Sequence, residues 1–524
     1  MASIFNFNIR TLDLLLSEHG IDLTWKRILV THLQRYPQFS YILEYKDFKS
    51  KKVLPSDLIE DLSIGEIGIL YEYSVTHGSV DNRKSNGQFF TPDDVAAFMA
   101  SYSLKFEDGV WLDPCSGIGN LSWHLVAVQP DPESFLLNNL VLSDTDDLAL
   151  LIARTLLTVS FQKKKKNLFF DIAENFKQFD FLSVADSADR GLFEVIDGLD
   201  RIPKHDFVIV NPPYLAIQAD SRFECAKAGD LFAYFLENII KSSRGFISIT
   251  PQSFTNAKKF SSLRKLILNN FKNLTIFCFD NVPANIFKGI KFGSKNSNQA
   301  NSIRASIMIA IEGSGKRKIS SLIRWKSSER ELLFRKASQH LSQVKLTDEF
   351  FPKVGKDYEE LFDFSSPLNR LGSISSAGKT RYALYIPSAP RYFIPALKKS
   401  VKRASQKTIY FDSALERDRA YMLINSSFMY WWWRVRDGGM TLSLETILSC
   451  PIPDFKLNAK LIKRLEASES KNKVYKQNAG EAQENVKHPK ALISSLNKVV
   501  IPQFASLLVD IHDNSDLSSK MKRK

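Results

Sequence analysis

Short apolar runs that stop abruptly at polar residues recur through the first half of this chain. Residues 207–210 read Phe-Val-Ile-Val and stop at Asn-Pro-Pro-Tyr, while residues 140–142 read Leu-Val-Leu and stop at Ser-Asp-Thr-Asp. Short, wholly apolar runs are typical of strands that helices cover on both faces, as in parallel sheets. In open sheets of this kind, ligands bind at the carboxyl ends of the strands. The pattern therefore predicts an α/β fold with a Rossmann-like sheet, and a site where these runs end.

The tetrapeptide Asn-Pro-Pro-Tyr at 211–214 suits one particular chemical task. The Asn211 side-chain oxygen and the Pro212 carbonyl can accept the two hydrogens of a planar exocyclic amine, while the prolines stiffen the turn. The ring of Tyr214 offers a surface on which a planar group can stack. Holding both hydrogens turns the amine lone pair toward an electrophile. The same residues also commonly do no more than end a strand, so the tetrapeptide alone leaves both interpretations open.

Three further strand ends carry groups suited to a nucleoside. Residues 111–120 predict a strand, a glycine turn and the start of a helix, which together bring backbone amides and partial positive charge to a ligand. The third glycine of the dinucleotide fingerprint is missing, which disfavours a nicotinamide or flavin cofactor. Asp144 suits ribose hydroxyls, although it or Asp146 could instead cap the next helix. Asp180 with Phe181 suits an adenine, or is a turn acid beside a core ring.

In their order along the chain, these motifs resemble those of S-adenosylmethionine-dependent DNA adenine-N6 methyltransferases with the gamma motif order. The family's Gly-Gln-Phe-x-Thr-Pro segment comes first, and residues 87–92 read Gly-Gln-Phe-Phe-Thr-Pro. The glycine turn, the acidic strand end, Asp-Phe, Asn-Pro-Pro-Tyr and a final target-recognition region follow. The resemblance spans residues 65 to 315 and continues more loosely to 455. Asn120 departs from it, because related proteins often carry glycine or an apolar residue there.

The resemblance implies roles for individual residues. Thr91 and Pro92 would hold the methionine end of S-adenosylmethionine, and Asp113 its amino group. Residues 230–235 resemble the helix that packs beside the cofactor pocket. The implied cofactor-binding set is Thr91, Pro92, Asp113, Pro114, Cys115, Gly117, Gly119, Asp144, Asp180 and Phe181. The implied catalytic set is Asn211, Pro212 and Tyr214, and the target base would stack on Tyr214 and on Phe260, which is favoured over Phe254.

The implied reaction is a direct transfer to N6 of an adenine that flips out of double-stranded DNA. A cytosine-C5 enzyme would instead need a nucleophilic cysteine in a Pro-Cys turn that carries the base. Pro114-Cys115 is the only such pair, and it lies in the presumed cofactor turn. Cys115 is therefore interpreted as a packing or cofactor contact.

Composition agrees with a nucleic-acid partner. The 524 residues carry a formal net charge of +14, which favours phosphate-rich ligands. The 4 cysteines show no paired spacing, so neither a disulfide framework nor a metal site is expected. No apolar run approaches the ~20 residues that span a bilayer. We expect a cytoplasmic protein of bacterial or phage origin that contacts no membrane.

Four segments are expected along the chain. Residues 1–78 predict a helical lead-in, 79–315 the catalytic domain, 316–455 an α+β target-recognition domain, and 456–524 a basic, partly helical tail. The lead-in contains Glu-Tyr-Lys at 44–46, half of a nuclease motif, but is short for a nuclease domain. In the target-recognition region, the tryptophans at 431–433 are expected in the core. Arg434 and Arg436 are candidates for DNA contact, with solvent-facing charge as the alternative.

Three alternatives remain open. The chain is also compatible with a modification subunit that needs a separate specificity subunit, as in type I restriction systems. Glutamine-N5 methyltransferases share Asn-Pro-Pro-Tyr but are short and lack the segment at 87–92. A non-catalytic DNA-binding module would keep the fold without turnover. The recognition region within the chain favours a self-sufficient, type II-like enzyme with a separately encoded restriction endonuclease.

Overall fold

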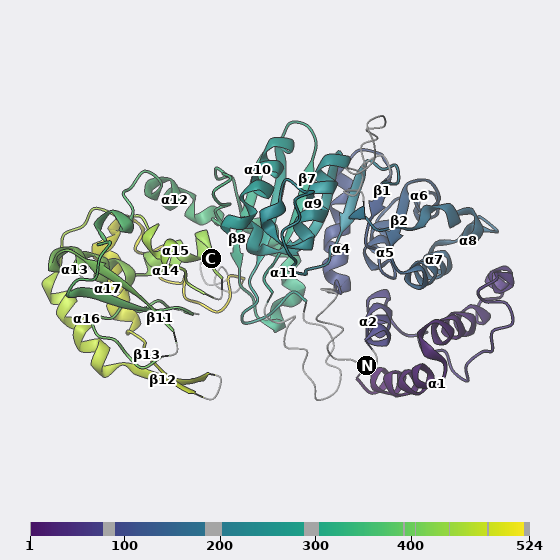
Figure 1. The fold of residues 1–524 in the computed structure, drawn as a ribbon, viewed down its shortest axis with the longest axis horizontal. Helices are drawn as coiled ribbons and strands as arrows, with labels where there is room; N and C mark the ends of the chain where they lie inside the picture. Colours follow the sequence, from purple (N-terminus) through teal and green to yellow (C-terminus); the bar gives the residue numbers. More distant parts are fainter. Residues whose placement is uncertain are drawn as a thin grey trace. The chain divides into compact units, whose positions relative to one another are not determined.

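The computed structural model describes residues 2–76, 90–183, 202–287, 303–390, 393–403, 405–439, 441–478 and 481–517. The chain forms two compact units, which Figure 1 shows as ribbons. The N-terminal unit contains Met1–Ile276, Asn285–Lys316 and Thr347–Glu349. The C-terminal unit contains Phe277–Ala284, Arg317–Leu346 and Phe350–Lys524.

A mostly parallel sheet forms the centre of the N-terminal unit, which confirms the predicted α/β fold. Its strands run in the order β3-β2-β1-β4-β5-β7, followed by β6, of which residues 273–276 belong to this unit. All neighbours from β3 to β5 pair in parallel, and β7 pairs with β5 in the antiparallel direction. The strands are β1 (Trp111–Asp113), β2 (Leu140–Asp144), β3 (Phe176–Gln178), β4 (Phe207–Val210), β5 (Gly245–Pro251), β6 (Asn273–Phe279) and β7 (Ala305–Ile311).

Every residue of β4 is buried, as its apolar sequence predicts. Along the chain, helices follow β1, β2, β4 and β5, so each of these strand ends leads into a helix. In this way α5 begins directly after the glycine turn, and Asp146 caps α7. The helices are α4 (Asp93–Ser101), α5 (Asn120–Ala127), α6 (Pro132–Asn138), α7 (Asp147–Phe161), α8 (Leu168–Asp171), α9 (Leu231–Ser242) and α10 (Ser261–Asn270).

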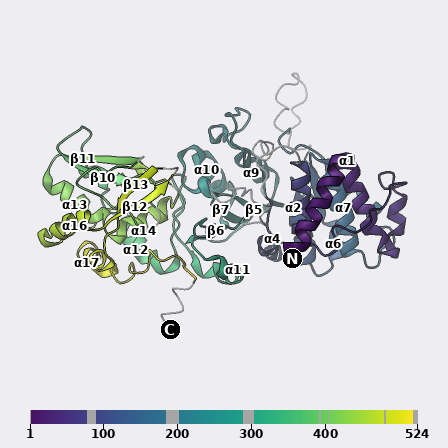
Figure 2. The ribbon, with the colours of Figure 1, turned by 90° about the horizontal axis from the view of Figure 1, so that it is seen from below.

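The first 76 residues are largely helical and share a core with the sheet's outer helices. Helix α1 (Ala2–Gln34) is interrupted at Gly20, whose φ is 70°, and α2 (Ile64–Val75) begins with a Ser63–Glu66 capping box. Side chains of α1 and α2 form one apolar cluster with residues of α7, and Figure 2 shows α1 beside α7. These helices are therefore an integral part of the N-terminal unit.

The C-terminal unit mixes short strand pairs with helices. Its strands are β8 (Arg317–Ile323) with β9 (Leu341–Ser342), β10 (Tyr382–Pro387) with β11 (Gln406–Phe411), and β12 (Lys473–Asn478) with β13 (Glu481–Val486), all antiparallel pairs. Its helices are α11 (Arg330–Ala337), α12 (Glu359–Ser365), α13 (Ala414–Ile424), α14 (Ser427–Arg436), α15 (Leu444–Leu448), α16 (Ala459–Lys471) and α17 (Lys490–Val500).

Helix α14 is buried along its whole length, and the three tryptophans at 431–433 are at most 3% exposed. The expectation that they pack in the core is confirmed.

Among the described residues, no helix combines the length and the apolar character that crossing a bilayer requires.

Candidate active site at the carboxyl edge of the sheet

A cavity of about 680 Å³ opens at the carboxyl ends of β1, β2 and β4. Parallel strands all end at this edge, which explains why motifs far apart in the sequence meet here. The residues from the implied sets that line it are Thr91, Asp113, Pro114, Cys115, Gly117, Asp144, Asp180, Phe181, Asn211 and Pro212. Four others from the N-terminal unit, Pro92, Gly119, Tyr214 and Phe260, do not line it. Gly87, Gln88 and Phe89 lie outside the described residues.

The glycine turn has the backbone that its sequence predicts. Gly117 and Gly119 have φ values of 51° and 83°, in the left-handed region that side-chain-bearing residues rarely adopt. The Gly117 amide donates to Asp144 Oδ2 at 2.8 Å, which ties the turn to the end of β2. A Cβ at Gly119 would lie 3.1 Å from Cβ of Ala153 on α7, so the turn is also packed closely from behind.

Asp113, at the end of β1, is 1% exposed. Its Oδ2 accepts a hydrogen bond from the Ser122 hydroxyl at 2.9 Å, while its Oδ1 has no hydrogen-bond partner among the described residues. Burial, and secondarily the charge of Asp144, raise the pKa of Asp113 to about 7, against the lowering effect of the Ser122 bond. A buried carboxyl oxygen of this kind in a cavity wall is suited to receive a cationic group.

Asp144, the last residue of β2, and Asp146, two residues later, have different roles. Asp146 Oδ1 accepts from the amides of Leu148 and Ala149 at 3.1 and 3.2 Å and so caps α7. Asp144 does not cap the helix but accepts from Gly117 and, at 3.0 Å, from the Asp146 amide. Burial raises the pKa of Asp144. Both acids line the cavity, but Asp146 caps the helix, whereas the Asp144 carboxylate is held by the amides of Gly117 and Asp146.

Asp180 and Phe181 follow β3 and also line the cavity. The carboxylate of Asp180 accepts from the Leu182 amide at 2.9 Å. The ring of Phe181 stacks on Phe235 of α9 with centroids 5.3 Å apart and an interplanar angle of 26°. Phe181 is thus both a core residue, 1% exposed, and part of the cavity lining.

Thr91 connects the glycine turn to the Asn-Pro-Pro-Tyr segment. The Asn120 side chain donates to the Thr91 carbonyl at 2.7 Å, and the Asn211 side-chain nitrogen donates to the Thr91 hydroxyl at 2.9 Å. In the second bond the amide nitrogen of Asn211 faces Thr91, so its side-chain oxygen points away from Thr91. Asn120, the departure from the family pattern, therefore holds the Thr91 segment in place.

The Cys115 thiol donates to the Asn211 carbonyl at 3.3 Å. Burial, reinforced by the charges of Asp113 and Asp144, raises the pKa of Cys115 well above its ordinary value. A cysteine nucleophile requires a thiolate, so this environment is that of a packing or cofactor contact.

An aromatic cluster lies against the tetrapeptide at 211–214. The Tyr214 hydroxyl donates to the Ile249 carbonyl at 2.9 Å, and its ring meets Phe287 edge-on with centroids 6.0 Å apart. Phe260 is fully buried, with its ring 5.2 Å from that of Phe232. The role of Phe260 as a second ring for the target base stays a prediction.

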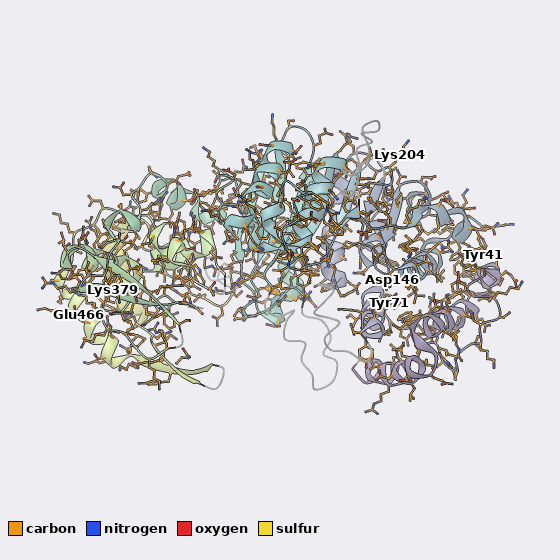
Figure 3. The ribbon with its side chains drawn as sticks, viewed as in Figure 1. Tyr41, Tyr71, Asp146, Lys204, Lys379 and Glu466 are labelled. Atoms are coloured by element: carbon orange, nitrogen blue, oxygen red, sulfur yellow. The ribbon has the colours of Figure 1, made fainter. Side chains whose placement is uncertain are left out.

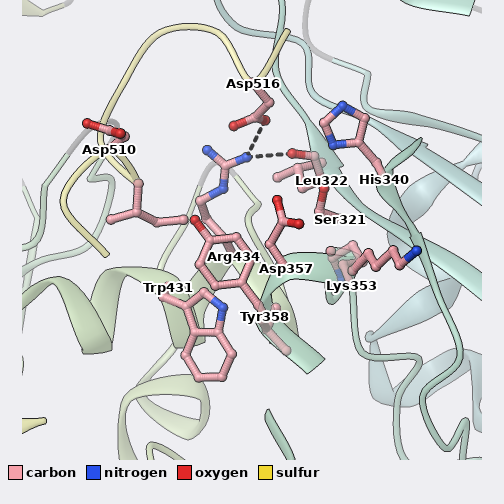
Figure 4. A pocket seen from close by; sticks show the side chains of 14 residues that line it. Ser321, Leu322, His340, Lys353, Asp357, Tyr358, Trp431, Arg434, Asp510 and Asp516 are labelled. Carbon is pink, nitrogen blue, oxygen red and sulfur yellow. Dashed lines mark hydrogen bonds and ion pairs between the residues drawn. The ribbon is translucent and has the colours of Figure 1, made fainter. Parts of the chain in front are cut away.

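Arg434 and Arg436 lie inside the C-terminal unit, with 5% and 8% of their surface exposed. Figure 4 shows the Arg434 guanidinium bound to the Leu322 carbonyl and to Asp516, at 3.1 Å from that carboxylate. Arg436 pairs with Glu445 at 3.3 Å. Solvent-facing charge, the alternative to DNA contact, does not hold for either residue, because both arginines are buried. Their contact with DNA stays a prediction, without support from these surroundings.

Sequence reasoning missed one wall of the cavity. Gly68, Tyr71, Glu72 and Val75 of α2 line it, at the i, i+3, i+4, i+7 spacing of one helix face. Leu231 and Phe235 of α9 also line it, as expected for the helix beside the pocket. The spacing within α2 was visible in the sequence, but nothing there indicated which surface it faces.

Two family models match consecutive parts of the chain. Residues 63–131 match N-6 DNA Methylase, and residues 138–287 match Eco57I restriction-modification methylase. None of the curated proteins matches the chain.

Several solved structures are similar at low identity. A DrdV–DNA complex is 16% identical over 62% of this chain and 37% of its own, with a TM-score of 0.41. A modification subunit of a putative type I restriction enzyme from Vibrio vulnificus YJ016 is 14% identical over 57% and 62%, with a TM-score of 0.37. The type IIG restriction endonuclease BpuSI is 12% identical over 97% and 78%, with a TM-score of 0.41. The chain thus spans less than two thirds of the first two proteins.

Proposed function

We propose that this chain, whose residues 63–131 and 138–287 form an N6-adenine DNA methyltransferase region of the restriction-modification type, methylates adenine at N6 in double-stranded DNA. The observation that carries the proposal is the hydrogen bond from Asn211 to Thr91 at the wall of the cavity. It orients the amide so that its oxygen, with the Pro212 carbonyl, can accept the two hydrogens of an adenine amine.

The residues of the cavity fit S-adenosylmethionine. Asp113 presents a buried oxygen that suits an ammonium group, and Asp144 presents a fixed carboxylate that suits ribose hydroxyls. The left-handed glycine at 117 leaves the turn open, since no atom lies within 4 Å of a Cβ built there. Bound in this cavity, S-adenosylmethionine would supply an electrophilic methyl group on a sulfonium sulfur.

The chain's own task is then to position the acceptor and to exclude water. Asn211 and Pro212 hold the amine hydrogens, so the nitrogen lone pair is directed away from the two acceptors. Tyr214 supports the base by stacking. No residue has to form a covalent bond to the base, in agreement with the raised pKa of the Cys115 thiol.

Two considerations support double-stranded DNA as the substrate class. An adenine amine within a base-paired duplex is not accessible to a walled cavity, so the target base has to flip out. The net charge of +14 favours additional contacts between the protein and the phosphate backbone of the DNA. The protein then works as a self-sufficient modification enzyme that protects DNA from a separately encoded restriction endonuclease.

Expression of the chain in cells that lack adenine methylation tests this function directly. Sequencing of their DNA with detection of modified bases is expected to find N6-methyladenine at one recurring motif, and none in cells that express Asn211→Ala. Unmodified DNA together with a soluble chain that binds S-adenosylhomocysteine would point to a separate specificity subunit. A soluble chain that binds no cofactor would refute the proposal and favour a non-catalytic module.

A further inference from the structure

Helix α2 contributes one face to the cavity although it belongs to the helical segment that precedes the catalytic motifs. Two glycines on this helix allow the approach. A Cβ built at Gly65 or Gly68 would lie closer than 3.0 Å to Asp93 or to the ring of Phe90, respectively. Residues 90–93 include Thr91, whose hydroxyl binds Asn211. The fit of α2 against this segment therefore fixes the helix to the wall that carries the catalytic motif.

A chain of hydrogen bonds runs from α2 to the glycine turn. The Tyr71 hydroxyl donates to Asp146 Oδ2 at 2.5 Å, and the two residues are labelled in Figure 3. The Asp146 amide donates to Asp144 Oδ1 at 3.0 Å, and Asp144 Oδ2 accepts from Gly117. Tyr71 therefore helps to fix Asp146, and the backbone amide of Asp146 in turn helps to fix the Asp144 carboxylate.

Tyr71 is itself held from behind by α1. The indole of Trp25, which is fully buried, meets the Tyr71 ring edge-on with centroids 5.3 Å apart. The Trp25 ring nitrogen donates to the Ser74 hydroxyl at 2.9 Å, one turn further along α2. Burial, followed by the charge of Asp146, raises the pKa of Tyr71, so the hydroxyl stays protonated and remains a donor.

We propose that Tyr71 is a positioning residue for the cofactor, and that the helical segment at 2–76 is a structural part of the cofactor site. The proposal rests on the proposed function. Tyr71 acts through Asp146 on Asp144, the carboxylate suited to the ribose, and its side chain lines the same cavity. A helix from the first 76 residues thereby sets the affinity of a site whose chemical groups lie later in the chain.

The test compares Tyr71→Phe with Tyr73→Phe in the full-length protein. Tyr73 lies on the same helix and also donates to a carboxylate, Asp13 Oδ1 at 2.6 Å, but does not line the cavity. Each variant loses one hydroxyl and retains its ring, so both are expected to fold with similarly lowered melting temperatures. The dissociation constant for S-adenosylhomocysteine, measured by calorimetry, is expected to rise about tenfold in Tyr71→Phe only, as for a lost hydrogen bond to a charged group.

Kinetics provide the second readout. In Tyr71→Phe, KM for S-adenosylmethionine is expected to rise while kcat stays within about twofold, because the groups that hold the base are untouched. Unchanged affinity in Tyr71→Phe, or an equal loss in both variants, would overturn the proposal and leave Tyr71 with a structural role only. Failure of the wild-type chain to bind S-adenosylhomocysteine would instead overturn the proposed function.

Discussion

At Asp113, deep burial coincides with an oxygen that has no hydrogen-bond partner among the described residues. Its pKa of about 7 lies well above the ordinary 3.8, so the ligand-free protein loses stability as the pH rises between these two values. A cationic group of a bound ligand stabilises the ionised form of Asp113 and so offsets this loss of stability. We therefore expect S-adenosylhomocysteine to raise the melting temperature more at pH 8 than at pH 6.

Thermal unfolding with and without the ligand at both pH values checks this prediction, with Asp113→Asn as the matched variant. The variant keeps the shape of the side chain but has no charge to titrate, so the difference between the two pH values should largely disappear. Asp230, whose pKa burial raises to about 6, provides the control in Asp230→Asn, which should leave the ligand effect unchanged. An equal ligand effect at both pH values in the wild type would contradict the role of Asp113.

Asn211 and Tyr214 are expected to affect transfer and cofactor binding very differently. Asn211→Ala removes one of the two acceptors that we propose for the amine, and such a loss typically lowers kcat by about 10²-fold or more. Tyr214→Ala removes the stacking surface and should act in the same direction. The affinity for S-adenosylhomocysteine should remain within about threefold of wild type in both, since in the proposed function their side chains contact the base. A loss of affinity equal to that in Asp113→Ala would count against these roles.

At the scale of the elements, α2 offers a sharp test of close packing. Gly68→Ala places a Cβ against the ring of Phe90, and overpacking of this kind costs about 1–3 kcal/mol. The free energy of unfolding, from urea titration, should fall accordingly, together with the affinity for S-adenosylhomocysteine. Gly378→Ala is the control, because no atom lies within 4 Å of a Cβ there. Equal stability of the two variants would show that α2 does not approach residues 90–93 as described.

The strand-end motifs could be predicted because each is local. Parallel strands bring Asp113, Asp144 and Asn211 to one edge, whatever the details of the helices between them. The position of α2 could not be predicted, because it depends on how Gly65 and Gly68 fit residues distant in the sequence. The burial of Arg434 was missed for the same reason. Its partner Asp516 lies 82 residues away, and sequence alone does not separate a paired, buried arginine from an exposed one.

At the scale of the whole molecule, the end of the chain stabilises the interior of the C-terminal unit. Asp516 pairs with Arg434 at 3.1 Å and accepts from the Arg324 amide at 2.7 Å. Asp516→Ala leaves a buried guanidinium without its carboxylate, a change that typically costs about 3–5 kcal/mol. Urea unfolding should reveal this loss. Lys490→Ala, which breaks an exposed pair with Asp513, should change the stability by less than about 1 kcal/mol. Similar losses in both variants would contradict the buried pair.

The path of the chain also limits how the protein can be divided. Phe277–Ala284 belongs to the C-terminal unit, although it precedes the expected domain boundary at residue 315. In that unit, the Cys278 amide donates to the Ser320 hydroxyl, and the Asp280 amide to the Ile323 carbonyl, each at 2.8 Å. A fragment that ends at residue 315 lacks both acceptors and exposes Phe277 and Phe279, which are fully buried in the intact chain.

We therefore expect a fragment of residues 1–315 to aggregate, although it contains every residue that lines the cavity. Unpaired backbone donors and exposed aromatic rings along β6 would drive its self-association. Soluble yield, size-exclusion chromatography and binding of S-adenosylhomocysteine, each compared with the full chain, measure the outcome. A soluble, monomeric fragment with the affinity of the intact protein would show that the N-terminal unit folds without residues 317–323. The cofactor site would then be separable from the C-terminal unit after all.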